Sequence, residues 1–489
     1  TSHDAFTPSL HLGPHLFEVL VAAAPVVLDT PHYFQRDAVT RAELSLPTLQ
    51  KELNTLLSPE SVVIFPSDPR WDEVTRRWRT TAPPDVQVVV QPAEEGDVPE
   101  IGVQIDLKQL TEITIIPDGN SAMLQGGSYV SNIVAALWDK GYVTSTGSVD
   151  CVGAVGTALG GDHSRYEGIY GLIADQVIQF NVVLADGSTI EVSETSHEDL
   201  FWAMKGAGHN FGIVTSIRFK IYPAEVKTWH YHNYVWTQDK MESVFRELNK
   251  INDDGATPPE LVNAGSIAFN QSVSTTEATI SWEFSYAGSA QDAEKVLAPF
   301  NTIEAVHQEQ GDVPYPEISR IGNPDGAICN SANFEVSTVL TQTWNLTTQH
   351  QLLENFLQNA AKYPELGQTA RLFYEGYSVK AVTAIDPAST AYPHRDEYHL
   401  AIFMMTVPEG REDLSSAASQ WAREVWDLFQ AGQPTRKPAV YVNYVAGHDY
   451  ETLESIYGHE PWRLARLRDL KAKYDPENRL RYFVPIIPE

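Results

Sequence analysis

The chain has 489 residues, of which 43 % are hydrophobic, and it carries a formal net charge of −30. This length permits two or three domains with a large core, while the acidic excess argues against nucleic acid and anionic membranes as partners, since both attract a basic face. Its only cysteines, Cys151 and Cys329, are too few for a disulfide framework or a cysteine metal site. Because CxxC and HExxH patterns are also lacking, we expect no metal site. The acidic charge favours a neutral or cationic small molecule as the ligand, and we expect the protein to be a monomer.

The first 55 residues form an expected N-terminal extension, with an amphipathic, helix-like run at residues 46–57. Residues 16–28 are apolar, but they lack a basic leader and are too short to cross a bilayer, so we expect a buried strand or helix there. The chain begins at Thr1 without a methionine, and Asn270 and Asn345 stand in Asn-x-Ser/Thr glycosylation patterns. We therefore expect a secreted glycoprotein, with an intracellular protein as the alternative.

A glycine-rich unit at residues 153–223 follows two expected short strands. Its first small residues let backbone or a ligand approach closely, because glycine has no Cβ. Asp186-Gly187 between two Val- and Ile-rich runs is a strong hairpin signal. Since the glycines lack GxGxxG spacing between a strand and a helix, and no GxxxxGKS or GxxxxGKT occurs, we exclude a Rossmann site and a P-loop. The elements expected up to this point are strands at 61–66, 86–91, 176–184, 189–192 and 213–221, and a helix capped by Ser196 and stopped at Gly206 and Gly208.

From residue 227 the pattern changes to alternating strands interrupted by helices. Such an order predicts an antiparallel sheet covered by helices. The expected elements are strands at 230–236, 261–270 and 278–287, and helices at 291–300, 349–362 and 413–430. After residue 436 the chain returns to the first domain, and we expect a ligand site in the cleft between the two domains.

Motifs at both ends of the chain resemble the FAD-linked oxidases of the vanillyl-alcohol oxidase and p-cresol methylhydroxylase type, in the fungal berberine-bridge-enzyme-like branch. The matching residues are Val152-Gly153 through Gly160-Gly161, Tyr170-Gly171-Leu172 with Asp175, Ala185-Asp186-Gly187, Asp199-Leu200-Phe201-Trp202, residues 206–215, Tyr441-Val442-Asn443-Tyr444 and residues 474–478. The resemblance implies an α+β fold with a bipartite, PCMH-type FAD-binding domain and an antiparallel-sheet substrate domain covered by helices. The implied parts are an extension at 1–55, the first part of the FAD domain at 56–226, the substrate domain at 227–436, and a C-terminal berberine-bridge-like segment at 437–489.

The same resemblance implies an FAD-dependent oxidase that uses O2 and acts on a small organic molecule, in secondary metabolism or in carbohydrate or alcohol oxidation. Carbohydrate, alkaloid and polyketide substrates all remain open. The cofactor residues that it implies are Val152, Gly153, Gly156, Thr157, Gly160, Gly161, His163, Ile213, Val214 and Asn443.

Tyr444 is the main catalytic candidate, as a tyrosinate base that needs a lowered pKa. Tyr441 beside it is a second candidate that can equally serve as packing. His399 is a third, on a strand that resembles the one facing the flavin, in a register uncertain by one residue. Tyr374, Glu375 and Tyr377 on an earlier strand are equally ambiguous.

Two departures from the family pattern, together with the absence of an obvious carboxylate or Gln base after His394-Arg395, favour a second hypothesis. In the family a helix, a strand and a loop ending in Gly-Gly-His precede the phrase at residues 102–107, whereas here Pro99-Glu100-Ile101 leads directly into it. In the family that loop binds the FAD pyrophosphate and carries the histidine tether, so we expect non-covalent FAD. Val149 stands at the second attachment position of bicovalent relatives, so we expect no bicovalent attachment either. Asp162 replaces a family glycine and would repel a diphosphate if it were ionised. The alternative is a flavin-free relative that catalyses a non-redox cyclisation or rearrangement by positioning alone.

Overall fold

The computed structural model describes residues 51, 53, 55, 57–80, 86–94, 104–253, 255–274, 276–322 and 327–488. The expected helix at 46–57 lies mostly outside these residues, and the apolar run at 16–28 and the shortened segment around Pro99 lie wholly outside them. Internal contacts divide the chain into two compact units, one of residues 1–75 and 84–106 and the other of residues 76–83 and 107–489. The four-part division expected from the sequence stays a prediction.

The smaller unit contains a three-stranded sheet in the order β1-β2-β3. Its described elements are β1 (Val62–Ile64), α2 (Trp71–Val74), β2 (Val89–Gln91) and β3 (Gln104–Ile105). β1 and β2 are antiparallel, whereas β2 and β3 are parallel. Ile64, Val89 and Val74 form one small cluster of buried side chains, and Val88 and Val90 belong to a second.

In the larger unit, five of the described strands form an antiparallel sheet in the order β4-β5-β9-β7-β8. The β7–β8 hairpin predicted at Asp186-Gly187 is confirmed, and Gly187 supplies the left-handed turn with a φ of +84°. The expected helix is also present as α6, but its N-cap is His197 rather than Ser196. The elements of this half are β4 (Ile113–Ile115), β5 (Ser121–Gln125), α3 (Val130–Trp138), α4 (Ala154–Ala158), β7 (Val177–Val183), β8 (Thr189–Ser193), α6 (Glu198–Ala207) and β9 (Ile213–Lys220).

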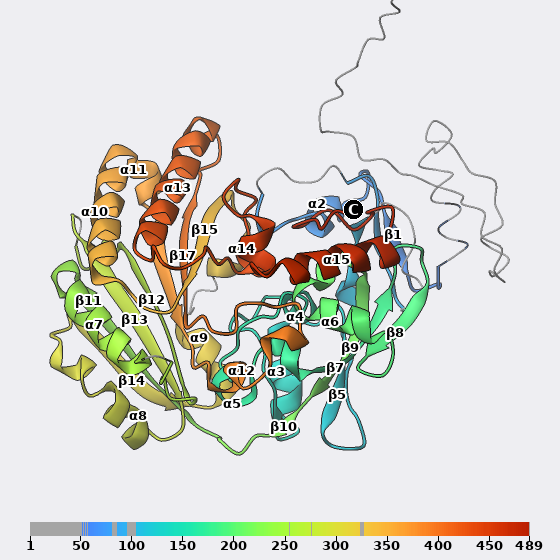
Figure 1. The fold of residues 1–489 in the computed structure, drawn as a ribbon, viewed down its shortest axis with the longest axis horizontal. Helices are drawn as coiled ribbons and strands as arrows, with labels where there is room; N and C mark the ends of the chain where they lie inside the picture. The colour runs from blue at the N-terminus through green and yellow to red at the C-terminus, as the bar shows by residue number, and fades with distance from the viewer. Residues whose placement is uncertain are drawn as a thin grey trace, which may run out of the picture. The chain divides into compact units, whose positions relative to one another are not determined.

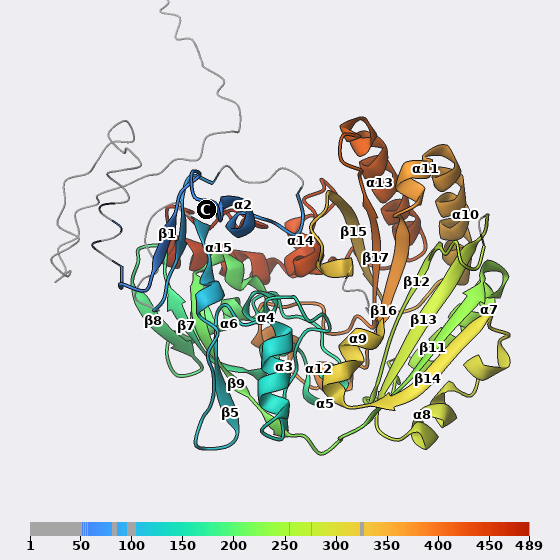
Figure 2. The same cartoon turned by 180° about the vertical axis from the view of Figure 1, so that it is seen from behind.

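Seven further strands form a second antiparallel sheet, in the order β14-β11-β13-β12-β16-β17-β15. Figure 1 and Figure 2 show helices covering one face of this sheet and leaving the other face toward the five-stranded half. The strands are β11 (Trp229–Thr237), β12 (Leu261–Phe269), β13 (Ala278–Ala287), β14 (His307–Val313), β15 (Phe334–Thr341), β16 (Arg371–Gly376) and β17 (His399–Thr406). The covering helices are α7 (Met241–Asn252), α8 (Ala290–Leu297), α10 (Leu346–Lys362), α11 (Pro364–Gly367) and α13 (Ser415–Ala431).

Aromatic side chains join the helices to this covered face. Phe245 of α7 lies 5.1 Å from Tyr374 of β16, and Trp421 of α13 lies 5.2 Å from Phe403 of β17, measured between ring centroids. Each strand and helix predicted after residue 227 is present within a few residues of its expected bounds, and the expected α+β class is confirmed. The shorter elements α5 (Glu167–Tyr170), α9 (Ile318–Gly322) and α12 (Lys380–Thr383) lie between the two sheets (Figure 1). β6 (Tyr142–Val143) pairs with β10 (Tyr222–Pro223).

The C-terminal segment packs on the five-stranded half. It contains the 3-10 turn Val442–Tyr444, α14 (Leu453–Tyr457) and α15 (Pro461–Tyr474). The Asn210 side chain accepts a hydrogen bond from the amide of Ile486 and donates one to the carbonyl of Val484, so the glycine-rich motif before β9 holds the end of the chain. Lys471 and Asp475, both fully buried, form an ion pair of 2.6 Å at the end of α15.

The two cysteines of the chain are paired with each other. Cys151 and Cys329 form one disulfide, which links residues 178 positions apart in the sequence. Two cysteines cannot build a framework of several bridges, but a single bridge needs only that the fold bring them together. Cys151 directly precedes the glycine-rich unit, and Cys329 precedes β15, so the bridge joins the two halves of the larger unit.

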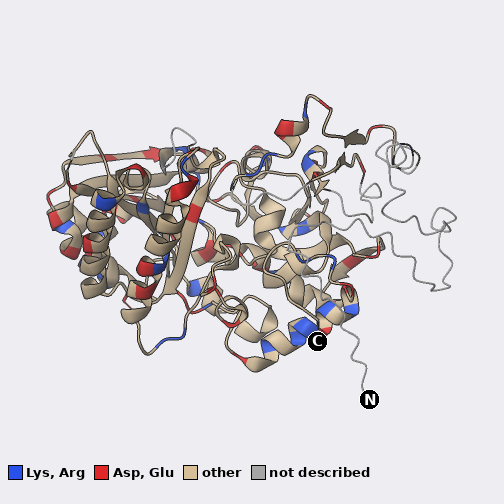
Figure 3. Cartoon of the chain, turned by 90° about the horizontal axis from the view of Figure 1, so that it is seen from above, with Lys and Arg blue, Asp and Glu red and all other residues tan. Residues whose placement is uncertain are grey.

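Charged residues are distributed over the helices and strands, with acidic and basic side chains interspersed (Figure 3). Within the described ranges, no helix is both long enough and apolar enough to span a bilayer. The acidic residues behind the net charge of −30 are thus not confined to one segment of the described residues.

Candidate functional site

The glycine-rich unit presents two different surfaces. Gly153 caps α4, and a Cβ placed on Gly153 or on Gly156 would meet no atom within 4 Å. Val152 and Thr157 are half-buried beside them. The backbone of this helix is therefore open to close approach by a ligand, and amide groups in the first turn of a helix have no acceptor within the helix.

The next two glycines approach the protein itself. A Cβ on Gly160 would lie 2.0 Å from Oδ1 of Asn443, and a Cβ on Gly161 would lie 2.5 Å from the ring of Tyr392. Asn443 donates hydrogen bonds to the carbonyl of Thr157 at 3.1 Å and to the hydroxyl of Tyr441 at 2.7 Å. These glycines thus let the C-terminal segment pack directly onto the end of α4.

Asp162 follows in a left-handed conformation with a φ of +56°, a region in which glycine is relaxed and aspartate is tolerated. Its carboxyl group is buried and accepts a hydrogen bond from the hydroxyl of Tyr441. Burial raises the pKa of Asp162, although the hydrogen bond from Tyr441 opposes the rise. The side chain is therefore turned into the protein, where burial makes its ionisation less favourable than it would be in water.

A second carboxyl group enters from the seven-stranded sheet. Glu375 of β16 accepts hydrogen bonds from the hydroxyls of Tyr377 at 2.8 Å and Tyr444 at 3.4 Å. Burial raises the pKa of Glu375, and the two tyrosine hydrogen bonds lower it only in part. The raised pKa moves this carboxyl group toward the pH range in which general acids and bases work.

His163 pairs with a third buried carboxyl group, that of Glu167. Its Nδ1 lies 3.0 Å from Oε2 of Glu167, and its ring stacks on that of Tyr377 at 5.1 Å and meets that of Tyr441 edge-on at 5.1 Å. Burial by itself would lower the pKa of His163, but Glu167, Glu375 and Asp162 raise it to about 9. The imidazole is therefore protonated at neutral pH and balances part of the surrounding negative charge.

The expected tyrosinate at Tyr444 needs a correction. Burial raises the pKa of Tyr444 well above 10, and the nearby carboxyl groups of Glu375 and Asp162 raise it further. Burial has the same effect on Tyr441. Both phenols are protonated in this structure, because a second negative charge is unfavourable beside buried carboxyl groups. Either tyrosine can still donate a proton, or pass one on to a carboxylate.

His399 lies on the other face of the sheet. Its neighbours across β16 and β17 follow the antiparallel register, in which Glu375 is opposite Leu400 and Tyr374 is opposite Ala401. Because side chains alternate, Leu400 shares the face of Glu375, while His399 shares that of Tyr374. His399 stacks on Trp344 at 4.5 Å, and burial lowers its pKa to about 3. The structure does not bring His399 to the site.

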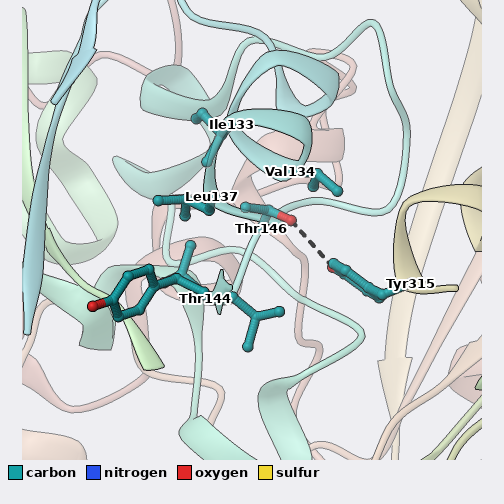
Figure 4. A pocket seen from close by; sticks show the side chains of 8 residues that line it. Ile133, Val134, Leu137, Thr144, Thr146 and Tyr315 are labelled. Atoms are coloured by element: carbon teal, nitrogen blue, oxygen red, sulfur yellow. Dashed lines mark hydrogen bonds between the residues drawn. The ribbon is translucent and has the colours of Figure 1, made fainter. Parts of the chain in front are cut away.

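The remaining expected residues have structural environments. Val214 is a buried residue of β9 that pairs with Val182, and Ile213 begins the strand half-buried. Arg395, from the family-like Pro-His-Arg turn, forms a buried two-point ion pair with Asp175, at 2.7 and 3.0 Å. A small cavity between α3 and Tyr315 (Figure 4) has eight lining residues, none of them charged, so it offers no acid–base chemistry.

Residues 70–193 match the family model of the FAD binding domain. The chain is 48 % identical over 508 aligned positions to the FAD-linked oxidoreductase iacH of Pestalotiopsis fici, covering 98 % of each protein. It is 44 % identical to the FAD-linked oxidoreductase anuG of Penicillium roqueforti, covering 92 % of this chain and 94 % of that one. The chain belongs to the family of FAD-linked oxidoreductases.

Solved structures place the oxidoreductase within the berberine-bridge-enzyme-like fold. Wild-type BBE-like 1 of Physcomitrella patens superposes with a TM-score of 0.75 at 16 % identity, over 90 % of this chain and 100 % of that one. A berberine bridge enzyme variant in complex with (S)-reticuline gives 0.74 at 15 % identity, over 90 % and 99 %. The resemblance expected from the sequence motifs is thereby confirmed, as is the PCMH-type fold.

FAD is the cofactor of this oxidoreductase family, and the open face of α4 fits it. Gly153 and Gly156 leave room where a Cβ would stand, and the carboxyl group of Asp162 is buried and accepts a hydrogen bond from the hydroxyl of Tyr441. Oδ2 of Asp162 is buried without a hydrogen-bond partner among the described residues, which leaves it available to a bound group. By contrast, the space that a Cβ would take at Gly160 and at Gly161 is already occupied by Asn443 and Tyr392, respectively.

Sequence reasoning missed how Glu375, Glu167 and Asp162 come together. Asp162 was visible only as a departure from the family glycine, and Glu375 only as one of three ambiguous residues on its strand. The spacing of four between His163 and Glu167 was a local signal that could have suggested their ion pair.

Proposed function

We propose that the oxidoreductase is an oxidase that removes a proton and a hydride equivalent from a hydroxyl-bearing small organic molecule, with O2 as the final electron acceptor. The flavin, when bound, supplies the electron acceptor for the substrate and passes the electrons to O2. Val152, Gly153, Gly156 and Thr157 would hold its diphosphate part on the open face of α4.

The arrangement of Glu375 and Tyr444 carries this proposal. A standing tyrosinate is disfavoured, so Tyr444 would accept the substrate proton only while it donates its own proton to Oε1 of Glu375, 3.4 Å away. Tyr377 fixes the second carboxylate oxygen through its own hydroxyl at 2.8 Å. Glu375 thus acts as the proton acceptor, Tyr444 as the group that contacts the substrate, and Tyr377 as a positioning residue.

The test uses Glu375→Gln, which keeps the size of the side chain but cannot take up the proton. We expect kcat to fall about 10²- to 10⁴-fold with little change in substrate affinity. Tyr444→Phe should lower kcat similarly, whereas the matched control Tyr377→Phe should have the smaller effect. A Glu375→Gln variant with wild-type kcat would remove Glu375 from the mechanism.

The flavin-free cyclisation remains testable, although the names of the relatives favour the redox reaction. Flavin titration of the apo-protein decides between them, since the oxidase requires saturable binding and O2 consumption. The alignment of 508 positions exceeds the 489 residues of this chain, so iacH has at least 508 − 489 = 19 residues without a counterpart here. The direct run of Pro99-Glu100-Ile101 into residues 102–107 supports a non-covalent cofactor, which acid precipitation should release into the supernatant.

We also propose that the enzyme works in secondary metabolism and passes through an oxidising compartment. The Cys151–Cys329 disulfide supports the second point, because such bonds persist mainly in secreted proteins. Of the two glycosylation patterns, Asn270 lies in the turn after β12, whereas the amide of Asn345 caps α10 and donates to the carbonyl of Gly432. Glycan mapping of the secreted protein should therefore find Asn270 modified and Asn345 unmodified.

A further inference from the structure

Three metal-binding side chains meet on the helix-covered face of the seven-stranded sheet. His230 and His232 alternate along β11, and Glu294 reaches them from α8. Oε1 of Glu294 lies 3.1 Å from Nε2 of His230 and 2.8 Å from Nδ1 of His232, and the three ligand atoms all lie within 4.8 Å of one another. The two imidazoles are almost fully buried, while the Glu294 side chain is 29 % exposed, so solvent ions can reach the cluster.

The cluster is separate from the catalytic face. Through the sheet register, Tyr234 of β11 is opposite Trp282, Trp282 is opposite Gly265, and Gly265 is opposite Tyr374. His230 and His232 therefore share the face of Tyr374, whereas Glu375 points to the other side.

Each imidazole uses its second nitrogen to contact an acceptor on β14. Nδ1 of His230 lies 2.7 Å from Asp312, its direct cross-strand neighbour, and Nε2 of His232 lies 3.3 Å from the side-chain oxygen of Gln308. Metal-binding histidines are usually oriented by such acceptors, which hold the proton on the far nitrogen. When the far nitrogens carry the protons, both remaining lone pairs point at the carboxylate oxygen of Glu294, and a cation between them makes these contacts favourable. Nδ1 of His232 also lies 3.0 Å from the hydroxyl of Tyr234, which the ion would displace.

The carboxylate of Glu294 is also held in place. Its second oxygen accepts a hydrogen bond from Asn301 at 2.9 Å, and Asn301 accepts one in turn from the hydroxyl of Tyr234 at 2.8 Å. The donor atoms are consequently preorganised by residues from α8, β11, β14 and the turn after α8.

We propose that His230, His232 and Glu294 form a binding site for one zinc-like divalent transition-metal ion. Two imidazole nitrogens and one carboxylate oxygen are a donor set that zinc accepts, whereas magnesium and calcium prefer oxygen alone. Ligands bonded at about 2.0–2.2 Å lie roughly 3.4 Å apart in tetrahedral geometry, so the present separations of 2.8 and 3.1 Å need only a small expansion. Glu294 and the neighbouring Asp312 balance the two positive charges, and water occupies the fourth position.

The bound ion would connect α8 to the edge of the sheet. Because α8 covers β11 and β14 lies at the end of the strand order, the ion would fasten a helix and two strands that otherwise meet through side-chain packing. The site is thus structural, and it is independent of the proposed oxidase mechanism.

The experiment titrates Zn²⁺ into the chelator-treated full-length protein and follows heat and melting temperature, with Co²⁺ as a coordination probe read by its visible absorption. We expect one ion per chain, a rise in melting temperature, and no response to Mg²⁺. Glu294→Gln should abolish this binding, and Asp312→Asn should weaken it about 10- to 100-fold. The matched control is His350→Gln, since His350 forms an exposed contact with Glu242 on the covering helices.

Circular dichroism of each variant shows whether it is folded, and Asp312→Asn keeps the test decisive if Glu294→Gln does not fold. Absence of saturable Zn²⁺ binding by the wild-type protein would overturn the proposal. Equal Zn²⁺ affinity in the wild type and in a folded Glu294→Gln or Asp312→Asn variant would overturn it as well. The ion would then bind elsewhere, and the two histidines would only be hydrogen-bonded to Glu294.

Discussion

Two glycines of the same short stretch should respond oppositely to alanine. At Gly156 a Cβ enters open space, so Gly156→Ala should keep or slightly raise the melting temperature, while weakening FAD binding roughly tenfold by blocking close approach. At Gly160 the Cβ would lie 2.0 Å from Oδ1 of Asn443, so Gly160→Ala should destabilise the fold by about 1–3 kcal/mol. Thermal melts and flavin fluorescence titrations measure both effects. If Gly156→Ala bound FAD like the wild type, the open face of α4 would not be the cofactor surface.

A single histidine should give the folded protein a measurable pH dependence. The pKa of His163 is raised from 6.5 to about 9 by Glu167, Glu375 and Asp162, although burial opposes the rise. A group with a raised folded-state pKa stabilises fully below its unfolded value, and that stabilisation is lost as the pH rises through the folded value. The free energy of unfolding should therefore fall between pH 6.5 and about 9, and His163→Gln should show a shallower decline. An identical slope in both proteins would contradict the assignment of His163 as a buried cation.

Among the helices and strands, buried ion pairs hold together segments that are far apart in the sequence. Arg395, on the turn before β17, pairs with Asp175 before β7, and both side chains are less than 5 % exposed. Asp175→Asn leaves the guanidinium buried without its counter-ion, which should cost about 3–5 kcal/mol in urea unfolding. Asp427→Asn is the control, since its pair with Arg423 is largely exposed and should contribute less than about 1 kcal/mol. Equal losses in the two variants would show that burial does not distinguish these pairs.

The same elements show what a sequence can and cannot reveal. The β7–β8 hairpin follows from Asp186-Gly187 and two apolar runs, because the signal is local. The position of His399 could not be predicted, since a shift of one residue in register moves a side chain to the opposite face of the sheet. The meeting of Glu375 with Tyr444 likewise depends on two segments 69 residues apart in the chain. His230 and His232 were overlooked because their alternation on a strand has no fixed spacing to Glu294.

At the scale of the whole molecule, the Cys151–Cys329 bridge is the strongest single constraint on the unfolded chain. It closes a loop of 178 residues, for which chain-entropy arguments give a stabilisation of up to about 5 kcal/mol. Cys151→Ser with Cys329→Ser should therefore lower the melting temperature, and reduction of the wild-type protein should lower it equally. Calorimetry with and without reductant is the measurement. If neither the double substitution nor reduction shifts the melting temperature, the unfolded chain must already be confined without the disulfide.

Asn443 and Tyr444 follow the other parts of the site in the sequence, and this order affects how the site is assembled. These residues complete a site whose other parts, from α4 to Glu375, are synthesised earlier. A ribosome delivers the N-terminal parts first, so both sheets can form while Gly160 and Glu375 still lack these two contacts. Acid–base chemistry at this site would thus begin only after residues 441–444 have been synthesised, and a product truncated before residue 441 would carry the glycine-rich unit without a working centre.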